Sequence, residues 1–302
     1  MSGSTDSRGV WYAVGAYTAW GLLPVYWKML RHVPAAQVIS HRILWSCVLL
    51  AAMLAASRRW SRFRAAAFAP RTLRQYAAAA GLIGINWSIF IWAVAAGFLV
   101  ETSLGYYINP LISVLLGVVV LGERLRLAQW LPIALAAAGV GYLTFTHGSV
   151  PWIALVLATS FALYGLVKKT APLGSLDGLA LETGLLFLPA LAVVAAGEAK
   201  GDGPLLGGGD ALTGLMLLSA GAVTTAPLLM FASAAQRIPL FWIGILQYIA
   251  PTLQLALGTL VYGEPFHRDQ LIGFAMVWAA LLVFLLEGLA ARRTPPVLLE
   301  AE

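Results

Sequence analysis

The stretch from Tyr107 to Glu123 reads YINPLISVLLGVVVLGE, and the stretch from Tyr248 to Glu264 reads YIAPTLQLALGTLVYGE. The two stretches lie 141 residues apart and align without a gap, with Tyr-Ile, Pro, Gly and Gly-Glu at the same places. Matches between apolar residues are frequent in any apolar chain, whereas a shared proline and a shared Gly-Glu pair in one frame are not. The sequence therefore predicts an internal repeat, with the same fold in both halves of the chain.

The composition indicates an integral membrane protein. Of the 302 residues, 60% are hydrophobic and only 11% are charged, whereas a soluble domain has about 25% charged residues. The apolar residues fall in runs of roughly 18 or more, which is long enough for a helix to cross a bilayer. These runs are continuous rather than alternating, which favours helices over a membrane barrel. We therefore expect an all-α integral membrane fold.

Ten apolar runs are visible, and the basic residues between them predict the orientation. With the N-terminus inside, 14 Lys and Arg lie on the inner side and 4 on the outer side, while Arg42 falls within a helix. Basic residues gather on the cytoplasmic side of membrane helices, so this distribution predicts an even helix number and two cytoplasmic termini. The predicted helices are 9–29, 34–56, 73–96, 99–121, 127–146, 150–168, 176–197, 210–235, 239–262 and 270–290.

The repeat and the helix count together predict an architecture. Each half contains five helices, and because five is odd, the second half enters the membrane in the opposite direction. We expect a first repeat over 1–146, a second repeat over 150–290 and a cytoplasmic tail over 291–302. Inverted repeats of this kind are a recurring design of secondary transporters, in which similar halves exchange conformations around a central site.

Seven stretches carry a recognisable pattern: 20–24, 41–46, 86–87, 103–111, 121–124, 164–169 and 247–252. With these stretches and the repeat, the chain resembles the EamA group of the drug/metabolite transporter superfamily over almost its full length. The resemblance implies an inner-membrane permease with ten helices and both termini in the cytoplasm. It also implies a small solute as partner, such as a metabolite, an amino acid or a drug-like compound, usually exported, and no cofactor. In one departure, Gln37 stands where similar proteins usually carry Glu.

Five ionisable residues are candidates for gating or ion coupling, because charges within a bilayer normally face a cavity or a partner. Arg42 lies about eight residues into its helix, and Glu101 enters from the same side, so we expect an outer Arg42–Glu101 interaction that acts as a gate or as a static ion pair. His41 adjoins Arg42 and titrates near neutral pH in its usual form, which makes it either a proton-coupling residue or a structural one. Glu182 is the counterpart of His41 in the repeat, and we expect it to form an inner cluster with Lys168 and Lys169. The alternative is that these two lysines serve only as topology determinants.

Two prolines predict where a substrate could bind. Pro110 and Pro251 occupy equivalent mid-membrane positions, and a proline frees a backbone carbonyl four residues back and kinks its helix. Transporters use such interrupted helices at the substrate site, although kinks also serve packing alone. The polar and aromatic side chains expected to line the cavity are Trp20, Asn86, Trp87, Tyr106, Tyr107, Asn109, Tyr164, Gln247, Tyr248 and Gln254.

Other classes of function find less support. The net charge of +6 follows from the orientation rule and not from binding nucleic acid. The sequence lacks the phosphate-binding pattern G-x-x-x-x-G-K-[ST], and its four histidines are scattered, so we expect no metal site. A non-transporting scaffold or a channel subunit is the main alternative, followed by an intramembrane enzyme. The coupling ion, with protons as one candidate, and the choice between monomer and homodimer stay open.

Overall fold

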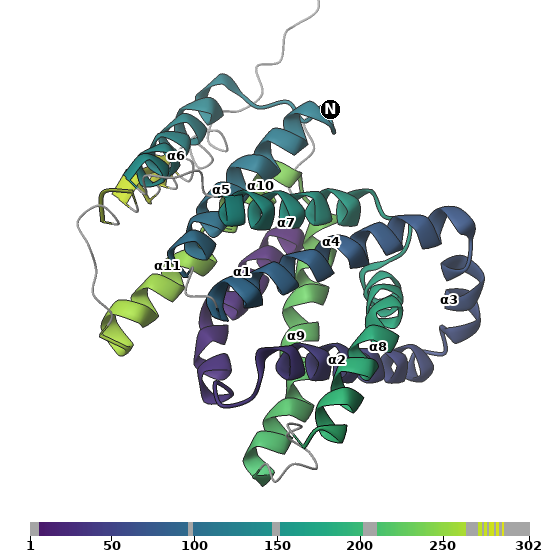
Figure 1. Ribbon diagram of the computed structural model, residues 1–302. Coiled ribbons are helices and arrows are strands. Elements are labelled where there is room, and N and C mark those ends of the chain that lie inside the picture. Colours follow the sequence, from purple (N-terminus) through teal and green to yellow (C-terminus); the bar gives the residue numbers. More distant parts are fainter. Residues whose placement is uncertain are drawn as a thin grey trace, which may run out of the picture.

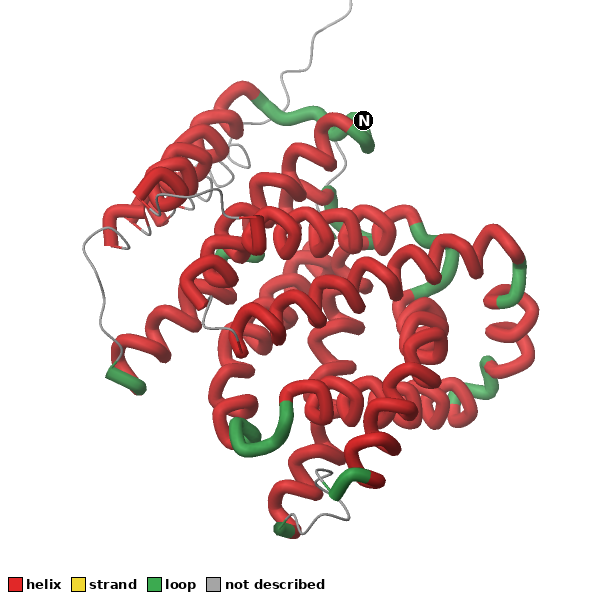
Figure 2. Tube along the Cα trace, viewed as in Figure 1, coloured by secondary structure: helices red, strands yellow, loops and turns green. Residues whose placement is uncertain are grey.

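The computed structural model describes residues 6–95, 99–146, 152–201 and 210–263, together with parts of 271–286. Within these residues the chain is helical throughout and forms no strand. Figures 1 and 2 show helices joined by short loops, with α9 passing through the centre and α6 at the periphery.

The described elements comprise eleven α-helices and one π-helix. Most of them are long enough to span or nearly span a bilayer, whereas α3, α10, α11 and η1 are short. They are α1 (Ser7–Met29), α2 (Ala35–Ala56), α3 (Trp60–Ala67), α4 (Pro70–Ala95), α5 (Leu99–Val119), α6 (Leu127–Thr146), α7 (Trp152–Thr170), α8 (Ser175–Ala199), α9 (Ala211–Ala235), α10 (Leu240–Leu246), α11 (Ile249–Ala256) and η1 (Leu257–Val261).

Nine of the ten predicted apolar runs coincide with these helices, and their ends differ by at most three residues. The tenth run, 270–290, lies partly outside the described residues, and its described residues between 271 and 286 are helical. By length and composition, five helices in the described part of the chain are suited to cross a membrane, and shorter apolar helices accompany them. The five are Ala35–Ala56, Trp152–Thr170, Ser175–Ala199, Ala211–Ala235 and Leu240–Val261.

The basic stretch 57–72 lies between two predicted helices and was expected to be a loop, but it contains the short helix α3. Arg58 adopts a left-handed φ of 53° and ends the run from α2, and α3 begins two residues later. Trp60 lies over Phe63 with ring centroids 5.8 Å apart, beside the cation Arg64. This combination of aromatic and basic residues is typical of a helix lying in the membrane interface. With only eight residues, the helix is too short to be recognised in the sequence as an apolar run.

The helices pack in a limited set of pairs. α1 lies against α9 and α11, and α7 lies against α4 and α5. α2 packs on both α8 and α9, α4 also touches α8, and α5 crosses α10. Small residues permit the closest crossings: a Cβ added at Gly244 would come within 2.7 Å of the Pro110 carbonyl oxygen, and one at Gly221 within 2.5 Å of the Trp45 carbonyl carbon. Such small-residue contacts are the usual means of close helix packing in membranes.

One end of the molecule collects the connections predicted to be cytoplasmic. The Glu123 carboxylate, after α5, accepts hydrogen bonds from the backbone N–H groups of Leu240 and Phe241 at 2.6 and 3.1 Å and so caps α10. Lys169, at the end of α7, donates to the Ile238 carbonyl oxygen at 2.6 Å. Gly122 supports the turn before Glu123 with a φ of 65°, as the Gly-Glu pattern predicts for a helix end.

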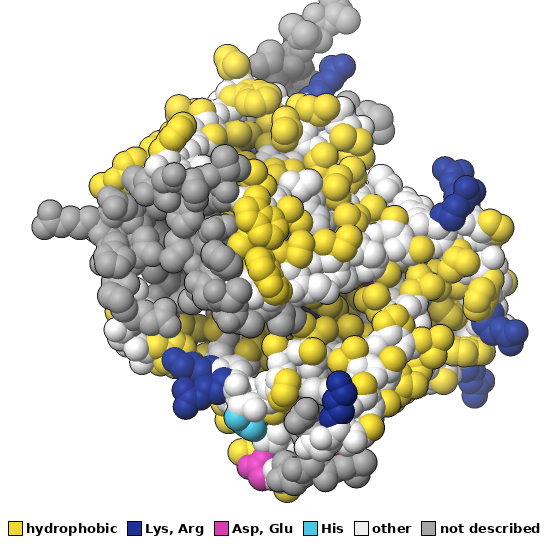
Figure 3. Space-filling view, in the orientation of Figure 1, with side chains coloured by type: hydrophobic (Ala, Val, Ile, Leu, Met, Phe, Trp, Pro, Cys, Tyr) yellow, Lys and Arg dark blue, Asp and Glu magenta, His cyan; other side chains and the backbone are white. Residues whose placement is uncertain are grey.

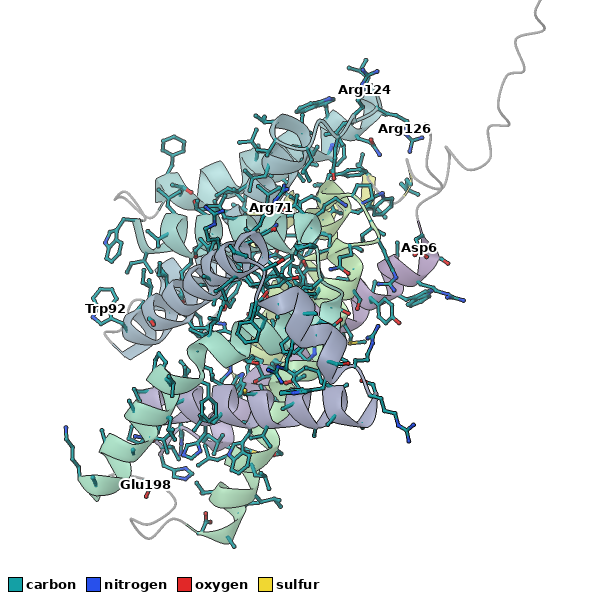
Figure 4. All side chains as sticks on the ribbon, turned by 90° about the vertical axis from the view of Figure 1, so that its right-hand side faces the viewer. Asp6, Arg71, Trp92, Arg124, Arg126 and Glu198 are labelled. Carbon is teal, nitrogen blue, oxygen red and sulfur yellow. The ribbon has the colours of Figure 1, made fainter. Side chains whose placement is uncertain are left out.

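The opposite end holds the α1–α2 loop, the end of α8 and the start of α9, which are predicted to be external. The His32 ring nitrogen Nε2 and the Thr213 hydroxyl lie 2.9 Å apart and join the α1–α2 loop to α9. Gln37 donates to the Val193 carbonyl at 2.9 Å and joins α2 to α8. Figure 4 shows Glu198, near the end of α8, far across the molecule from Arg124 and Arg126.

The outer surface is apolar over much of its area. Large side chains such as Leu127, Phe145 and Leu188 are more than two-thirds exposed. In Figure 3, hydrophobic side chains cover much of the visible face, and most Lys and Arg side chains lie toward its margins. An apolar band bordered by basic residues is the surface expected of a protein immersed in lipid.

Candidate functional site

A cavity of about 190 Å³ lies among seven helical segments near the centre of the fold. Its walls come from both halves of the chain: α1, α2, α4 and α5 contribute from the first, and α7, α9 and α10–α11 from the second. The described lining is mostly apolar and includes seven aromatic rings, with a few amides and hydroxyls and one formal charge, that of Arg42.

Seven of the ten side chains predicted to line a cavity border this one. They come from α1, α4, α5 and the α10–α11 region, so sequence-distant segments converge here. The seven are Trp20, Asn86, Trp87, Tyr106, Asn109, Gln247 and Gln254.

The three remaining tyrosines lie outside this lining. Tyr107 and Tyr248 each follow a lining residue by one position, and one step along a helix turns a side chain by about 100°. The two pack on one another away from the cavity, with ring centroids 6.4 Å apart, and the Tyr248 hydroxyl donates to the Tyr107 carbonyl oxygen at 3.2 Å. Tyr164 lies deeper, stacked on Phe231 at 6.0 Å and donating to Glu182.

Several of the lining amides also tie helices together. Asn86 donates to the Leu157 carbonyl at 2.9 Å, and Asn109 donates to the Ala158 carbonyl at 2.6 Å. Gln254 donates to the Trp20 carbonyl oxygen at 3.2 Å. These bonds fix α7 against α4 and α5, and α1 against α11, so part of the polar lining has a structural task.

The two prolines have different effects. α5 stays helical through Pro110, whereas the helix of Pro251 is divided at Gln247–Tyr248 into α10 and α11. The break lies four residues before Pro251, where the ring removes a helical hydrogen bond. The sequence predicts a free Gln247 carbonyl, but the carbonyl accepts a hydrogen bond from the Ala250 N–H, three residues ahead, at 3.2 Å.

Arg42 is held by aromatic rings. Its Cζ lies 4.3 Å from the Trp87 ring centroid and 5.1 Å from that of Trp27, within the roughly 6 Å reach of a cation–π interaction. Within the described residues its buried Nε has no hydrogen-bond acceptor. The Glu101 side chain, its predicted partner, lies outside the described residues, so the outer pair stays a prediction.

His41 points away from the cavity lining and is buried. Neither ring nitrogen meets a hydrogen-bond partner in the part of the chain that the structure describes. Its proton-coupling role stays a prediction.

The predicted inner cluster forms a buried ion pair. Lys168 Nζ lies 2.7 Å from Glu182 Oε1, and the two side chains are 1% and 2% exposed. Tyr164 donates to the other carboxylate oxygen at 3.0 Å. The Tyr76 and Tyr164 rings flank the ammonium, with centroids 5.5 and 5.7 Å from Nζ. The lysine therefore serves as more than a topology determinant at the helix end.

An aromatic cluster separates the cavity from this ion pair. Trp20 packs against Phe161 at 5.7 Å and Phe231 at 5.6 Å, and Tyr17 packs against Trp20 at 5.6 Å. Tyr164 stacks nearly parallel to Phe231 on the side of the ion pair. Tyr17, Trp20 and Phe161 border the cavity, and Phe231 and Tyr164 lie behind them, toward the ion pair.

Several lining residues were not anticipated from the sequence, among them Tyr17, Trp27, Phe90 and Phe161. Two of them carry a readable signal, because they follow predicted residues at helical spacing. Trp27 is seven positions after Trp20, and Phe90 is three after Trp87, so each shares a helix face with its predecessor. No group of three or more His, Cys, Asp or Glu that could hold a metal occurs among the described residues.

Known proteins are similar to this chain along almost its whole length. The EamA-like transporter family matches residues 7–145. Protein RarD of Streptomyces exfoliatus is 44% identical over 302 residues, which cover all of this chain and 96% of that protein. The chain belongs to the RarD proteins of the EamA-like transporter family. An uncharacterized transporter of Vibrio cholerae is 45% identical over 94% of each chain.

A more distant RarD relative carries a drug-related name. The chloramphenicol-sensitive protein RarD of Pseudomonas aeruginosa is 32% identical and covers 92% of this chain and 93% of its own. A solved crystal structure with 18% identity superposes with a TM-score of 0.68 and covers 96% of this chain and 100% of that one, which shows a shared fold. The RarD membership makes the chain a multi-pass membrane transporter of the drug/metabolite type rather than an enzyme.

Proposed function

We propose that the chain is a secondary transporter that moves a small solute by alternating access, built as two inverted five-helix repeats. In the repeat frame α1 corresponds to α7, α2 to α8, α4 to α9, and α5 to the α10–η1 segment. When the two halves are exchanged, the α1–α9 contact corresponds to α7–α4, and the α1–α11 contact corresponds to α7–α5. The α2–α9 contact corresponds to α8–α4. All of these pairs are in contact. The α2–α8 and α5–α10 pairs map onto themselves. This correspondence of the main helix pairs supports the proposal, although the α7–α9 and α8–α9 contacts have no comparable counterpart in α1–α4 and α2–α4.

The observation that carries the proposal is the central cavity with one closed side. The aromatic cluster and the buried Lys168–Glu182 pair lie between the cavity and the end that holds Lys169 and Glu123. The basic residues of that end support a cytoplasmic location. We assign this conformation to the state whose inner side is closed, with the aromatic cluster and the ion pair as the inner gate.

The orientation and compartment belong to the same proposal. Asp6 lies 3.8 Å from Arg237, which joins the start of α1 to the end that also contains the α7–α8 and α9–α10 connections. Both termini would then be cytoplasmic in the bacterial inner membrane, and export is the expected direction. Protons are the candidate coupling ion, with His41 as the candidate residue that carries them. The transporter would function as a monomer or as a homodimer.

Counterflow in proteoliposomes tests the proposal. Vesicles loaded with mixed pools of amino acids, small carboxylates or phenicol drugs are diluted into the same radiolabelled compounds. Saturable exchange that is lost in Arg42→Ala and kept in Arg71→Ala, a matched loss of an exposed arginine, is the expected result. Non-saturable conductance would instead indicate a channel. Folded protein without exchange, with or without a proton gradient, would contradict the transporter proposal.

A further inference from the structure

The described lining of the central cavity contains a positive charge and no negative one. Among the described residues that line it, Arg42 is the single formally charged side chain. A cation in a low-dielectric site is costly unless an anion or strong acceptors compensate it. The rings of Trp27 and Trp87 compensate part of this cost. A guanidinium that lies over ring faces keeps its N–H groups available for hydrogen bonds in its own plane.

The buried carboxylate of Glu182 does not supply an anion for Arg42. Glu182 shares with Arg42 only a small adjoining chamber of about 10 Å³. Both of its oxygens are engaged, Oε1 by Lys168 at 2.7 Å and Oε2 by the Tyr164 hydroxyl at 3.0 Å. This carboxylate is therefore neutralised by its own lysine, and the positive charge of Arg42 faces the cavity.

The side chains of the cavity walls indicate the size and polarity of the rest of an anionic ligand. The rings of Trp20, Trp87, Phe90, Tyr106 and Phe161 border the space, and aromatic walls suit an aromatic or branched apolar body. The volume of about 190 Å³ lies below the roughly 300–1,000 Å³ typical of sites for drug-sized ligands. The described lining contains no acidic side chain that could pair with a substrate ammonium group.

Resting on the proposed function, we propose that the transported solute is a small organic carboxylate with an aromatic or branched apolar body and no ammonium group. Its carboxylate binds the N–H edge of Arg42, since a guanidinium fork matches the geometry of a carboxylate. Its apolar body lies among the cavity rings, and the Gln247 amide at the α10–α11 break is positioned at the same cavity. The class excludes neutral drugs and favours simple carboxylic acids over amino acids.

Equilibrium binding to the purified full chain in detergent tests this class without any need for transport. The probe is radiolabelled 3-phenylpropanoate, with 3-phenylpropanamide and phenylalanine as competitors of almost the same shape. The amide removes the negative charge, and phenylalanine adds an ammonium. Each is expected to bind at least about tenfold more weakly, which corresponds to the loss of one charge-assisted contact.

Variants connect the preference to Arg42. Arg42→Gln should lose the carboxylate-over-amide preference, Arg42→Lys should keep part of it, and Arg71→Gln should leave it unchanged. The proposal differs from the Arg42–Glu101 pair predicted from the sequence, because it requires that Glu101 does not neutralise Arg42. Glu101→Gln is therefore expected to change affinity by less than about twofold. A marked gain in affinity would instead identify Glu101 as the anion that already compensates Arg42.

Each alternative outcome overturns the proposal. Equal binding of acid and amide, absence of acid binding, or an unchanged preference in Arg42→Gln would each do so. The acid–amide comparison needs only the wild-type chain, so poor folding of a variant cannot obscure the result. Saturable counterflow of neutral solutes would refute this class and leave the transporter proposal intact. Binding of the acid without counterflow would support the carboxylate class and contradict the transporter proposal.

Discussion

The buried Lys168–Glu182 pair allows a quantitative prediction. At 2.7 Å and an effective dielectric constant of about 20, two unit charges attract by about 6 kcal/mol. Removing both ions from water costs several kcal/mol each, so the net contribution of the pair is small. Deleting one partner leaves the other charge buried, and such single changes cost about 3–5 kcal/mol.

Three variants separate these effects. Lys168→Met leaves the Glu182 carboxylate with the Tyr164 hydroxyl as its remaining bond and should lower the free energy of unfolding by the full 3–5 kcal/mol. Glu182→Gln should cost less, because the new amide can still accept from Lys168, and the Tyr76 and Tyr164 rings stabilise the ammonium by about 1–2 kcal/mol. The double variant removes both charges and should recover more than half of the Lys168→Met loss.

The free energy of unfolding would be measured by reversible denaturant titration in mixed micelles, with tryptophan fluorescence as the signal. A double variant that loses the sum of the two single losses would refute the reasoning, because additivity means that the charges do not interact. Single losses below about 1 kcal/mol would also refute it, since an exposed ion pair contributes no more than that.

Three further predictions concern local contacts. Gly244→Ala brings a Cβ within 2.7 Å of the Pro110 carbonyl and should lower the free energy of unfolding by about 1–3 kcal/mol, whereas an Ala at the open Gly81 should not. Glu123→Gln weakens two caps on α10 and should cost about 0.5–2 kcal/mol in the same titration. Hydrogen bonds from Thr213 lower the pKa of Asp210, so the cap it provides holds at neutral pH and weakens as the pH falls below about 4. Asp210→Asn should flatten the pH dependence of thermal unfolding in that range.

The helices were predictable because apolar runs of bilayer length leave the backbone no alternative to helical hydrogen bonding. The short helix α3 was not predicted, since its eight residues, WSRFRAAA, include two arginines and a serine and form no apolar run of bilayer length. The division between α10 and α11 was anticipated from Pro251, but the rebonding of the Gln247 carbonyl depends on local backbone adjustment that proline alone does not specify.

The candidate site was predictable to a lesser degree. Polar residues in apolar runs indicated Asn86, Asn109 and Gln247, which do border the cavity. Sequence position alone does not reveal which side of a helix faces inward, so Tyr107 and Tyr248 were assigned to the wrong side of their helices. The ring partners of Arg42 come from α1 and α4, and only the folded chain brings them together.

The hydrogen bond from the Tyr248 hydroxyl to the Tyr107 carbonyl joins residues separated by the repeat distance of 141. Two equivalent positions therefore play unequal parts, one as donor and one as acceptor. If the halves interchange their shapes during transport, this bond reverses, and the Tyr107 hydroxyl donates to the Tyr248 carbonyl instead. Which of the two tyrosine hydroxyls donates this bond would then mark the face of the membrane that the transporter addresses. Replacing either tyrosine by Phe would favour one facing over the other, and the two replacements would bias it in opposite senses.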